Sequence, residues 1–378
     1  MGKNGERNTF NLQGSRVALV YDRVNKWGGA ERVIVALRKI FPEAVLFTSV
    51  YDKKRALWAK KIPVVASFLQ KIPYAAKHHE ALAAFMPIAF ESFNFDKFDL
   101  VVSLTSEAGK GIITKPATRH ISIILTPTRY LWSGYKDYFS NIFFRALTYP
   151  VISYLRFWDK LAAWRPDVLI AISQTVRSRI KKYYGLESEI IYPPLMVRTS
   201  QLARGSSKDE ERRAKTEKPG YFLVVSRLVP YKRVDLAVKA ATKLSLPLKV
   251  IGIGNEFARL KKIAGPTVEF LGYISDTDLK YYYANCRALI FPGVEDFGLS
   301  MVEAQAFGRP VIAFRGGGAE EIIIDGKTGK FFDRQTVAAL CDVLKNFRYK
   351  RYNSLDCKRN VRRFAFEQFK RKILSLTS

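Results

Sequence analysis

Short apolar runs alternate with longer amphipathic segments along most of the chain. In the first half, runs such as Arg16–Tyr21 and Ile121–Leu125 are rich in Val, Ile and Leu and are bounded by polar or turn residues, as buried strands are. Segments with a helical period separate these runs, and the same alternation resumes at Tyr221–Val225 and continues through Val311–Phe314. Strands that alternate with helices predict the α/β class, with parallel sheets.

The pattern predicts further elements in both halves. The other expected strands are Ala44–Ser49, Asp99–Ser103, Val168–Ile172, Ile190–Tyr192, Leu248–Ile251, Val268–Leu271 and Ala288–Phe291. The expected helices end at about Ile40 and Tyr184 in the first half, and in the second half they cover Asp235–Leu244, Phe257–Ala264, Asp276–Asn285, Leu299–Phe307 and roughly Val361–Leu376. Residues 56–95 are expected to be mostly helical, and residues 133–164 to contain helix.

A polar segment divides the two alternating halves. From about Thr199 to Lys218 the chain is charged and serine-rich and has no apolar period, which predicts a linker or a mobile loop. Two such halves predict two doubly wound, Rossmann-like domains, residues 1–197 and 198–360, with a cleft between them. The total of 378 residues suits two domains better than one.

Composition narrows the class of protein. A hydrophobic fraction of 48% is ordinary for a globular chain, and three cysteines without a pattern predict a reducing compartment and no disulfide framework. The three histidines lack metal-ligand spacing. There is no uncharged apolar run of membrane-spanning length, and the polar N-terminus lacks the apolar core of a signal peptide, so we expect neither feature.

Charge points to anionic partners. The chain has 63 Lys and Arg against 34 Asp and Glu, a net charge of +29, which favours nucleic acid, an anionic membrane or a polyanionic substrate. Lys53–Lys77 has seven basic residues, no acid and three aromatic residues, and Asp342–Ser378 has eleven basic and three acidic residues. Basic residues near anionic lipid contribute about 1 kcal/mol each, and aromatic rings anchor at membrane interfaces. The ten aromatic residues of Ser133–Trp164 fit either such an anchor or an ordinary helical core.

Two acids mark a candidate site in the second half. Glu295 lies between a predicted strand and a predicted helix, and Glu303 lies one turn into that helix. In open parallel sheets, ligands bind outside the carboxyl ends of strands. Spacing alone favours two solvated acids, but Phe297-Gly298-Leu299 places backbone N–H groups at the helix start, where oxygen ligands are favoured.

Basic residues and a glycine pair follow other strands. Arg227 and Lys232 come after Tyr221–Val225, where an Arg fork and a Lys charge would suit a diphosphate leaving group, although basic residues are common throughout this chain. Gly28-Gly29 opens the helix that follows Arg16–Tyr21, which is compatible with an anion cradle or with a tight turn only.

The segment EDFGLSMVEAQAFGRPVIAF, which begins at Glu295, resembles the signature of glycosyltransferase family 4, retaining enzymes of the GT-B fold. The likeness extends into Gly316–Glu321 and Gly326–Gly329 and covers nearly the whole chain. Two pieces, PIAFESFNFDKFDLVVSLTSEAGKGIIT and TPTRYLW, resemble a mannosyltransferase-like branch of that family.

The resemblance implies roles for these residues. Arg227 and Lys232 would neutralise the donor diphosphate, Glu295 would orient the sugar hydroxyls, and Glu303 would hold the nucleotide ribose beside Phe297, Gly298 and Leu299. The loop at Gly28 and Gly29 would face the donor diphosphate and the acceptor, and the helix of about 361–378 would pack back on the first domain. Because Arg227 and Lys232 would neutralise the leaving group, no metal is needed. Because the leaving phosphate itself would guide the acceptor hydroxyl, neither Glu need be a nucleophile.

Leu125 departs from the branch, which usually carries His at this position. In the wider family that His approaches the transferred sugar, commonly at its 6-hydroxyl, and the side chain of Leu125 cannot donate a hydrogen bond. The donor is therefore a 6-deoxy or smaller sugar, or the activity is weak, or Leu125 is only a strand residue and the polar role lies elsewhere. Arg129 and Tyr130 are candidate substrate contacts.

Two other motifs are interpreted structurally. Asp276 and Asp278 form an Asp-x-Asp pair, but Ser275 precedes them as a helix cap, and acids favour the first turn. We therefore predict no metal site there. Gly252-Ile253-Gly254 lacks the third glycine of a dinucleotide fingerprint.

The leading hypothesis is a retaining, metal-independent hexosyltransferase without a cofactor. It would move mannose from GDP-mannose to a lipid-linked or polysaccharide acceptor in cell-surface glycan synthesis. We expect it in the cytoplasm, peripheral on the inner face of the membrane. The alternative is a catalytically weak or degenerate GT-B protein that binds anionic membrane or nucleic acid. Net charge and Leu125 favour that alternative, whereas the presence of the site residues and the absence of a nucleic-acid motif oppose it. An epimerase or phosphorylase on the same fold is a third, less favoured reading.

Overall fold

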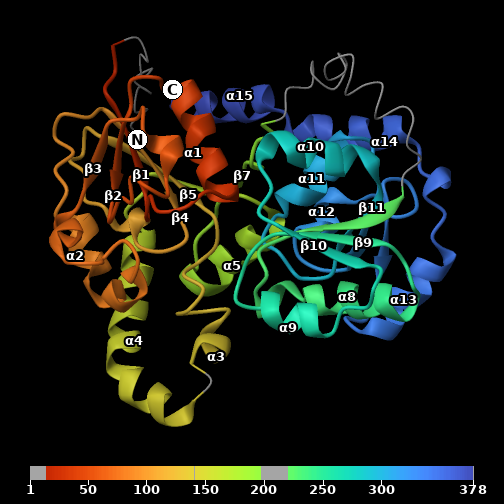
Figure 1. Ribbon diagram of the computed structural model, residues 1–378. Coiled ribbons are helices and arrows are strands. Elements are labelled where there is room, and N and C mark those ends of the chain that lie inside the picture. The colour runs from red at the N-terminus through yellow and green to blue at the C-terminus, as the bar shows by residue number, and fades with distance from the viewer. Residues whose placement is uncertain (1–13, 140, 197–219, 378) are drawn as a thin grey trace. The chain divides into compact units, whose positions relative to one another are not determined.

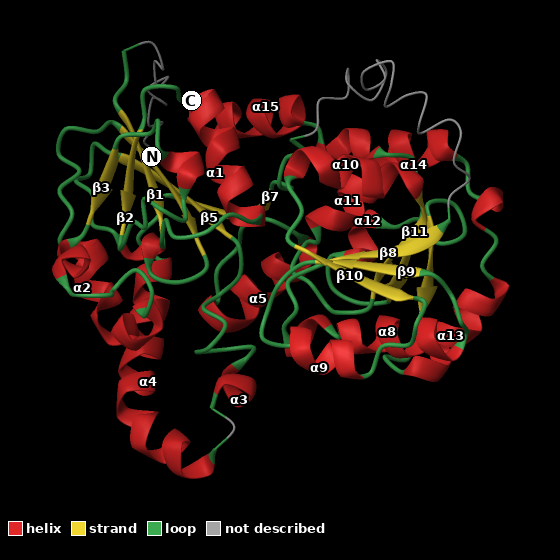
Figure 2. Cartoon of the chain, in the orientation of Figure 1, coloured by secondary structure: helices red, strands yellow, loops and turns green. Residues whose placement is uncertain are grey.

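The computed structural model describes residues 14–139, 141–196 and 220–377. These residues form two compact units (Figure 1). The first contains the described residues up to Pro194 together with the segment that begins at Phe366, and the second is Leu195–Ala365. The predicted linker, about Thr199 to Lys218, lies outside the described residues. Each unit is a parallel sheet with helices on its faces (Figure 2).

The sheet of the first unit has seven strands in the order β3-β2-β1-β4-β5-β6-β7, and every neighbouring pair is parallel. Its strands are β1 Val17–Tyr21, β2 Val45–Thr48, β3 Val64–Ala66, β4 Leu100–Thr105, β5 Arg119–Ile124, β6 Val168–Ala171 and β7 Glu189–Ile190. Its helices are α1 Gly29–Ile40, α2 Met86–Glu91, α3 Tyr135–Tyr138, α4 Ile142–Ala163, α5 Gln174–Tyr184 and α15 Phe366–Thr377.

The sheet of the second unit has six parallel strands in the order β10-β9-β8-β11-β12-β13. Its strands are β8 Tyr221–Val225, β9 Leu248–Ile251, β10 Val268–Gly272, β11 Cys286–Phe291, β12 Val311–Phe314 and β13 Gly329–Phe332. Its helices are α8 Val234–Lys243, α9 Phe257–Lys262, α10 Asp276–Asn285, α11 Leu299–Ala306, α12 Ala319–Ile322, α13 Val337–Asn346 and α14 Ser354–Asn360. Helices α8, α9 and α13 cover one face, and α10, α11, α12 and α14 cover the other (Figure 1).

Both strand orders are those of doubly wound folds, so the predicted α/β class with two Rossmann-like units is confirmed. The strands are short apolar runs because helices cover both faces of each sheet. In the second unit, Phe222, Val224 and Ile290 of the sheet pack with Leu236 of α8 and Leu340 of α13 in one buried core. Such burial at about 25 cal/mol per Å² of apolar surface is the main stabilisation of both units.

Two predicted helical regions differ from the structure. Residues 56–95 contain three 3₁₀ helices, the strand β3 and the short helix α2, because Val64–Ala66 pairs with β2 and draws this part of the chain into the sheet. The helix expected from about Val361 is interrupted at Ala365, whose extended backbone forms a bridge with Leu195. The regular helix α15 therefore begins at Phe366.

Helix α15 belongs to the first unit. It contacts α1, with the Lys39 ammonium 6.0 Å from the ring centre of Phe366, and Lys372 Nζ donates to Ile190 O at 3.4 Å. Among the described residues, no helix combines the length and the apolar character that crossing a bilayer requires. Strand β13 and helix α13 were not predicted, although Thr336 caps α13 by accepting from Ala339 N.

Candidate functional site

The predicted basic and acidic residues of the second unit lie at the point where its strand order reverses. Strands β8 and β11 are parallel neighbours, and the chain continues outward from them in opposite directions. Arg227 and Lys232 follow the carboxyl end of β8, and Glu295 follows that of β11. Ligands of doubly wound sheets bind at such a switch point, so the topology brings these three residues to one location.

Lys232 and Glu295 form an ion pair there. Their side chains are 11% and 18% exposed, which leaves both charged groups partly accessible. Gly293 permits the approach, since a Cβ at this position would lie 2.8 Å from Lys232 O. Arg227 Nη2 donates to the hydroxyl of Tyr231 at 2.6 Å. An Arg and a Lys next to a carboxylate provide the charges that a diphosphate and sugar hydroxyls would need.

The Gly252-x-Gly254 motif supports the loop that carries Arg227. A Cβ at Gly252 would overlap the carbonyl oxygen of Ser226, and one at Gly254 would overlap that of Leu228. Ser226 N donates to Ile251 O at 3.0 Å, and Leu228 N donates to Ile253 O at 3.0 Å. The two glycines therefore allow close contact between backbones, which explains a partial glycine-rich motif without a dinucleotide.

The glycine-rich loop after β12 packs against the Glu295 loop. Gly318 N donates to Glu295 O at 2.8 Å, and Gly317 and Glu295 form an isolated bridge. Gly317 has φ of 63°, and a Cβ there would overlap Glu295 O, so only glycine fits. The sequence likeness at Gly316–Glu321 thus corresponds to a contact that fixes the backbone of Glu295.

Helix α11 begins next to this loop. Gly298 adopts φ of 103° at the N-cap and Leu299 opens the helix, so the first backbone N–H groups have no partner within the helix. Phe297 is 3% exposed, with its ring 5.3 Å from that of Phe364, edge to face. The Phe297 side chain is therefore core, and only its backbone is available to a ligand.

Glu303 lies on α11 and is 7% exposed. Its Oε2 accepts a hydrogen bond of 2.8 Å from the hydroxyl of Tyr283, on α10. The Tyr283 ring is stacked on Phe307 at 5.9 Å, which holds the hydroxyl in place. A buried carboxylate whose position is fixed by an oriented donor is suited to binding vicinal hydroxyls.

The Asp276 and Asp278 pair has the predicted capping geometry. Ser275 is the N-cap of α10 and accepts from Asp278 N at 3.2 Å, and its hydroxyl donates to Asp278 Oδ2 at 2.7 Å. Both acids lie in the first turn, where the helix dipole stabilises negative charge. Within the described parts of the chain, no group of three or more His, Cys, Asp or Glu side chains has an arrangement that could hold a metal ion.

The remaining predicted residues belong to the first unit. Gly28 is the N-cap of α1 in an extended conformation, and Gly29 opens the helix. Glu31 lies in the first turn and is 1% exposed. Its carboxylate accepts a hydrogen bond of 2.6 Å from the hydroxyl of Tyr21. Burial and the nearby Glu31 carboxylate raise the pKa of Tyr21 well above its usual value, so the phenol remains a donor.

Leu125, Arg129 and Tyr130 follow β5 in the segment LTPTRYLW, Leu125 to Trp132. Leu125 lies one residue beyond the strand and is half-buried, and its N–H donates to Thr105 O at 2.8 Å. Burial, followed by the carboxylates of Glu107 and Asp159, raises the pKa of Tyr130 well above its usual value. Tyr130 is therefore a neutral hydroxyl at the carboxyl end of the sheet.

The switch point of the first unit holds a charged cluster that the sequence analysis missed. Asp22 follows β1 and accepts from Thr105 Oγ1 at 2.7 Å, Ser106 N at 2.7 Å and Gly109 N at 2.9 Å. Arg23 forms an ion pair with Glu107, which follows β4. Burial raises the pKa of Glu107, although Arg23 opposes this shift. The position of these residues directly after strands was the available signal.

A buried ion pair holds the TPTRYLW loop. Lys110 Nζ lies 2.5 Å from Asp159 Oδ1, and both residues are 1% exposed. Asp159, on α4, also accepts from Thr128 Oγ1 at 2.7 Å, Trp132 Nε1 at 2.7 Å and Tyr184 Oη at 2.8 Å. Both ends of the segment that carries Arg129 and Tyr130 are thus tied to one carboxylate.

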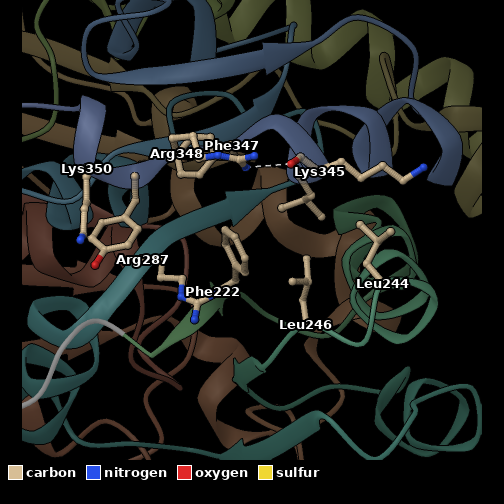
Figure 3. Close-up of a pocket in the computed structure, with 10 residues that line it drawn as sticks. Phe222, Leu244, Leu246, Arg287, Lys345, Phe347, Arg348 and Lys350 are labelled. Atoms are coloured by element: carbon tan, nitrogen blue, oxygen red, sulfur yellow. Dashed lines mark hydrogen bonds between the residues drawn. The ribbon is translucent and has the colours of Figure 1, made fainter.

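A cavity of about 470 Å³ lies away from these residues, near the amino ends of β8 and β11 (Figure 3). Its apolar lining includes Phe222, Leu246 and Phe347, and Arg287 and Lys350 lie among the basic residues around it. None of the predicted site residues lines it, so it is separate from the candidate site.

Comparison with solved structures identifies the fold: the chain has the GT-B fold. The structure of Anabaena Alr3699/HepE in complex with UDP matches with a TM-score of 0.70 and 18% identity, over 96% of this chain and 99% of that one. Sucrose-phosphate synthase from Thermosynechococcus elongatus matches with a TM-score of 0.72 and 15% identity, over 96% and 98%.

The second unit carries the sequence relationship. Residues 206–363 match the family model of glycosyl transferases group 1. The GDP-mannose-dependent alpha-(1-6)-phosphatidylinositol monomannoside mannosyltransferase of Mycolicibacterium smegmatis is 29% identical over 195 residues, which are 46% of this chain and 51% of the relative. The chain spans about half the length of the curated relatives it matches. The predicted resemblance to GT-B glycosyltransferases, and to mannosyltransferases among them, is confirmed.

Proposed function

We propose that this chain is a glycosyltransferase that transfers a hexose from a nucleotide sugar to a lipid-linked or polysaccharide acceptor in cell-surface glycan synthesis. The preferred donor is GDP-mannose, the anomeric configuration is retained, and no metal is required. The observation that carries the proposal is the Lys232–Glu295 pair at the β8/β11 switch point, within a segment that matches the group 1 family model.

Each residue has a role that its position supports. Arg227 and Lys232 neutralise the charge that develops on the diphosphate as the bond to the sugar breaks. Glu295 accepts hydrogen bonds from the sugar hydroxyls, and its pairing with Lys232 prevents an isolated charge before the donor binds. Glu303, oriented by Tyr283, accepts hydrogen bonds from the ribose hydroxyls.

The acceptor hydroxyl attacks from the face on which the diphosphate leaves, and the departing phosphate oxygen takes its proton. Neither Glu295 nor Glu303 is a nucleophile in this mechanism. From the first unit, we propose the backbone of Gly28 and Gly29 and the segment with Leu125, Arg129 and Tyr130 as substrate contacts. We place the protein in the cytoplasm, peripheral on the inner face of the membrane.

Donor binding is the first test. Thermal unfolding is followed with GDP-, UDP- and ADP-sugars, because the named relative uses GDP-mannose and the similar solved structure contains UDP. At a concentration of 100 times Kd, a specific ligand stabilises by about 2.7 kcal/mol. We expect this response with GDP-mannose, and we expect Glu303→Ala to lose it.

The product and the metal requirement are tested next. With a lipid-linked acceptor, NMR of the product should show the same anomeric configuration as the donor, and EDTA should leave the rate unchanged. If no nucleotide sugar binds while anionic vesicles or nucleic acid bind tightly, the chain is the degenerate binding module instead. Leu125 is tested by comparing GDP-mannose with its 6-deoxy analogue, which should bind at least as well if Leu125 faces the sugar.

A further inference from the structure

Helix α4 carries apolar residues on the side that faces away from the core. Its inner residues, Ile152, Leu155, Trp158 and Ala162, are buried, as expected of a helix packed on the first unit. The other side carries Phe143, Leu147, Pro150, Tyr154, Phe157 and Leu161, which we call the outer stripe. All six are exposed, Phe143 to 83% and Leu147 to 78%.

The outer stripe is one continuous line. Its residues follow one another in steps of four and three, which places them on a single face of a helix. From Phe143 to Leu161 the line is about 27 Å long at 1.5 Å per residue. Trp164, just beyond the helix and 66% exposed, extends it. Monomeric soluble proteins rarely expose a contiguous apolar surface of this kind without a partner.

The charges next to the stripe are positive. Between Tyr138 and Pro166 the chain has Arg145, Arg156, Lys160 and Arg165, and its only acid is Asp159, which is buried and paired with Lys110. Lys160 is exposed, and the Arg156 guanidinium lies 4.4 Å from the ring centre of Tyr135. The flanks of the stripe would therefore attract an anionic surface.

Other parts of the first unit also carry exposed apolar residues and basic residues. Trp158 of α4 donates to Glu91 of α2 at 2.7 Å, so these two helices are neighbours, as Figure 1 also shows. On or next to α2, Phe85 is 51% exposed and Ile88 is 54% exposed. The basic segment Lys53–Lys77 belongs to the same unit.

We propose that the outer stripe of α4 is a membrane anchor that inserts, parallel to the surface, into the headgroup region of an anionic lipid bilayer. An interfacial helix has this composition, with aromatic and leucine side chains on one face and basic side chains beside them. The helix does not cross the bilayer. The inference deepens the membrane location proposed above and rests on it.

A second copy of the chain fits the stripe less well than lipid does. The steps of four and three resemble a coiled-coil seam, but such seams use Leu, Ile and Val. This stripe has Pro150 at its centre, with Phe143, Tyr154 and Phe157 around it. Aromatic side chains at these positions suit the membrane interface. Two copies would also bring together chains that each carry a net charge of +29.

The test measures co-sedimentation of the full chain with vesicles of phosphatidylglycerol and phosphatidylcholine, against phosphatidylcholine alone. The variant Phe143→Ser/Phe157→Ser removes two exposed rings of the stripe, and Ile324→Ser/Leu355→Ser removes two exposed apolar side chains from the second unit. We expect the wild type to bind the anionic vesicles, the stripe variant to bind them at least tenfold more weakly, and the control variant to match the wild type.

A second measurement leaves the six residues of the outer stripe unchanged. Brominated lipids should quench part of the tryptophan fluorescence, and Trp164→Phe should remove most of that part. Absence of quenching, or equal vesicle binding by the stripe variant and the wild type, would overturn the proposal. So would sedimentation of the wild type as a lipid-free dimer that the stripe variant converts to monomer.

Stabilisation by GDP is measured on the same samples. The stripe variant should respond to GDP as the wild type does, since α4 lies outside the unit that carries Glu303. Vesicle binding without any response to a nucleotide sugar would leave the anchor in place and contradict the transferase. A response to GDP without vesicle binding would support the transferase and contradict the anchor.

Discussion

At the scale of single residues, the buried charges of the first unit are the most sensitive positions. Lys110 and Asp159 are enclosed together, and Asp159 also receives three neutral donors. A buried ion pair is weak support for stability in itself, but loss of one partner leaves the other charge without compensation. The network therefore fixes the loop with Arg129 and Tyr130 more than it stabilises the fold.

Replacement of Lys110 tests this network. Lys110→Met should destabilise the protein by about 3–5 kcal/mol, because the Asp159 carboxylate stays buried without its cation. Lys115→Met is the matched control, since Lys115 Nζ donates to Asp96 O at an exposed position, and its cost should stay within about 1 kcal/mol. Denaturant unfolding measures both, and equal small effects would contradict the interpretation.

His120 predicts a dependence of stability on pH. It is fully buried, and burial, with the nearby Arg165 charge, lowers its pKa to about 3. The unfolded chain takes up this proton near pH 6.5, so the free energy of unfolding should fall as the pH falls from about 6.5 to about 3. One such group contributes at most about 1.4 kcal/mol per pH unit.

The measurement is denaturant unfolding at several pH values in this window. His120→Gln should remove that contribution and flatten the dependence, while His78→Gln, at an exposed position, should leave it as in the wild type. A wild-type curve that His120→Gln does not change would show that other groups cause the acid sensitivity.

At the scale of elements, the loops after strands decide the candidate site. The loop after β12 is placed against the loop after β11 by Gly317 and Gly318, and the loop after β8 is placed by Gly252 and Gly254. Each contact joins two backbones at a distance that no side chain permits. The charged residues of the site are thus held by glycines several elements away in sequence.

Gly317→Ala tests this placement against Gly326→Ala. Both glycines have positive φ, 63° and 75°, so both variants carry a backbone penalty of about 1 kcal/mol. Only at Gly317 would the new Cβ also overlap Glu295 O, whereas Gly326 has open space. We expect Gly317→Ala to be the more destabilising and to weaken stabilisation by GDP-mannose, and Gly326→Ala to preserve it.

Ser275→Ala tests the capping interpretation of the Asp276 and Asp278 pair. Loss of the cap should cost about 1 kcal/mol of stability. If the pair only caps α10, Asp276→Asn/Asp278→Asn should leave transfer activity and its indifference to EDTA unchanged. A strong loss of activity in this variant, together with wild-type activity that EDTA abolishes and added Mn²⁺ restores, would favour a metal role instead.

At the scale of the whole molecule, the net charge of +29 governs adsorption on anionic surfaces. Electrostatic attraction is screened over about 10 Å at 0.1 M salt and about 3 Å at 1 M. Vesicle binding by the wild type should therefore weaken with salt but persist in part, because insertion of apolar side chains is not screened. Binding by Phe143→Ser/Phe157→Ser should disappear at high salt, and equal salt profiles would contradict the anchor.

The sequence by itself determined the fold class and the position of the candidate site along the chain. Runs such as Tyr221–Val225 and Ala288–Phe291 reveal buried strands because parallel strands are apolar on both faces. Arg227, Lys232 and Glu295 were found because polar residues directly after such strands stand out. Their functional roles stay predictions. The same rule, applied to the first unit, would have found Asp22, Arg23 and Glu107.

Only the tertiary structure decided which of these residues meet. The ion pair of Lys232 and Glu295 depends on β8 and β11 being neighbours, and sequence periodicity does not specify strand order. Backbone pairing between distant segments also changed the secondary structure that the local sequence pattern predicts. It makes Val64–Ala66 a strand, and it interrupts the predicted helix before Phe366. Both faces of α4 carry apolar residues in the sequence, so only packing distinguishes buried Leu155 from exposed Phe157.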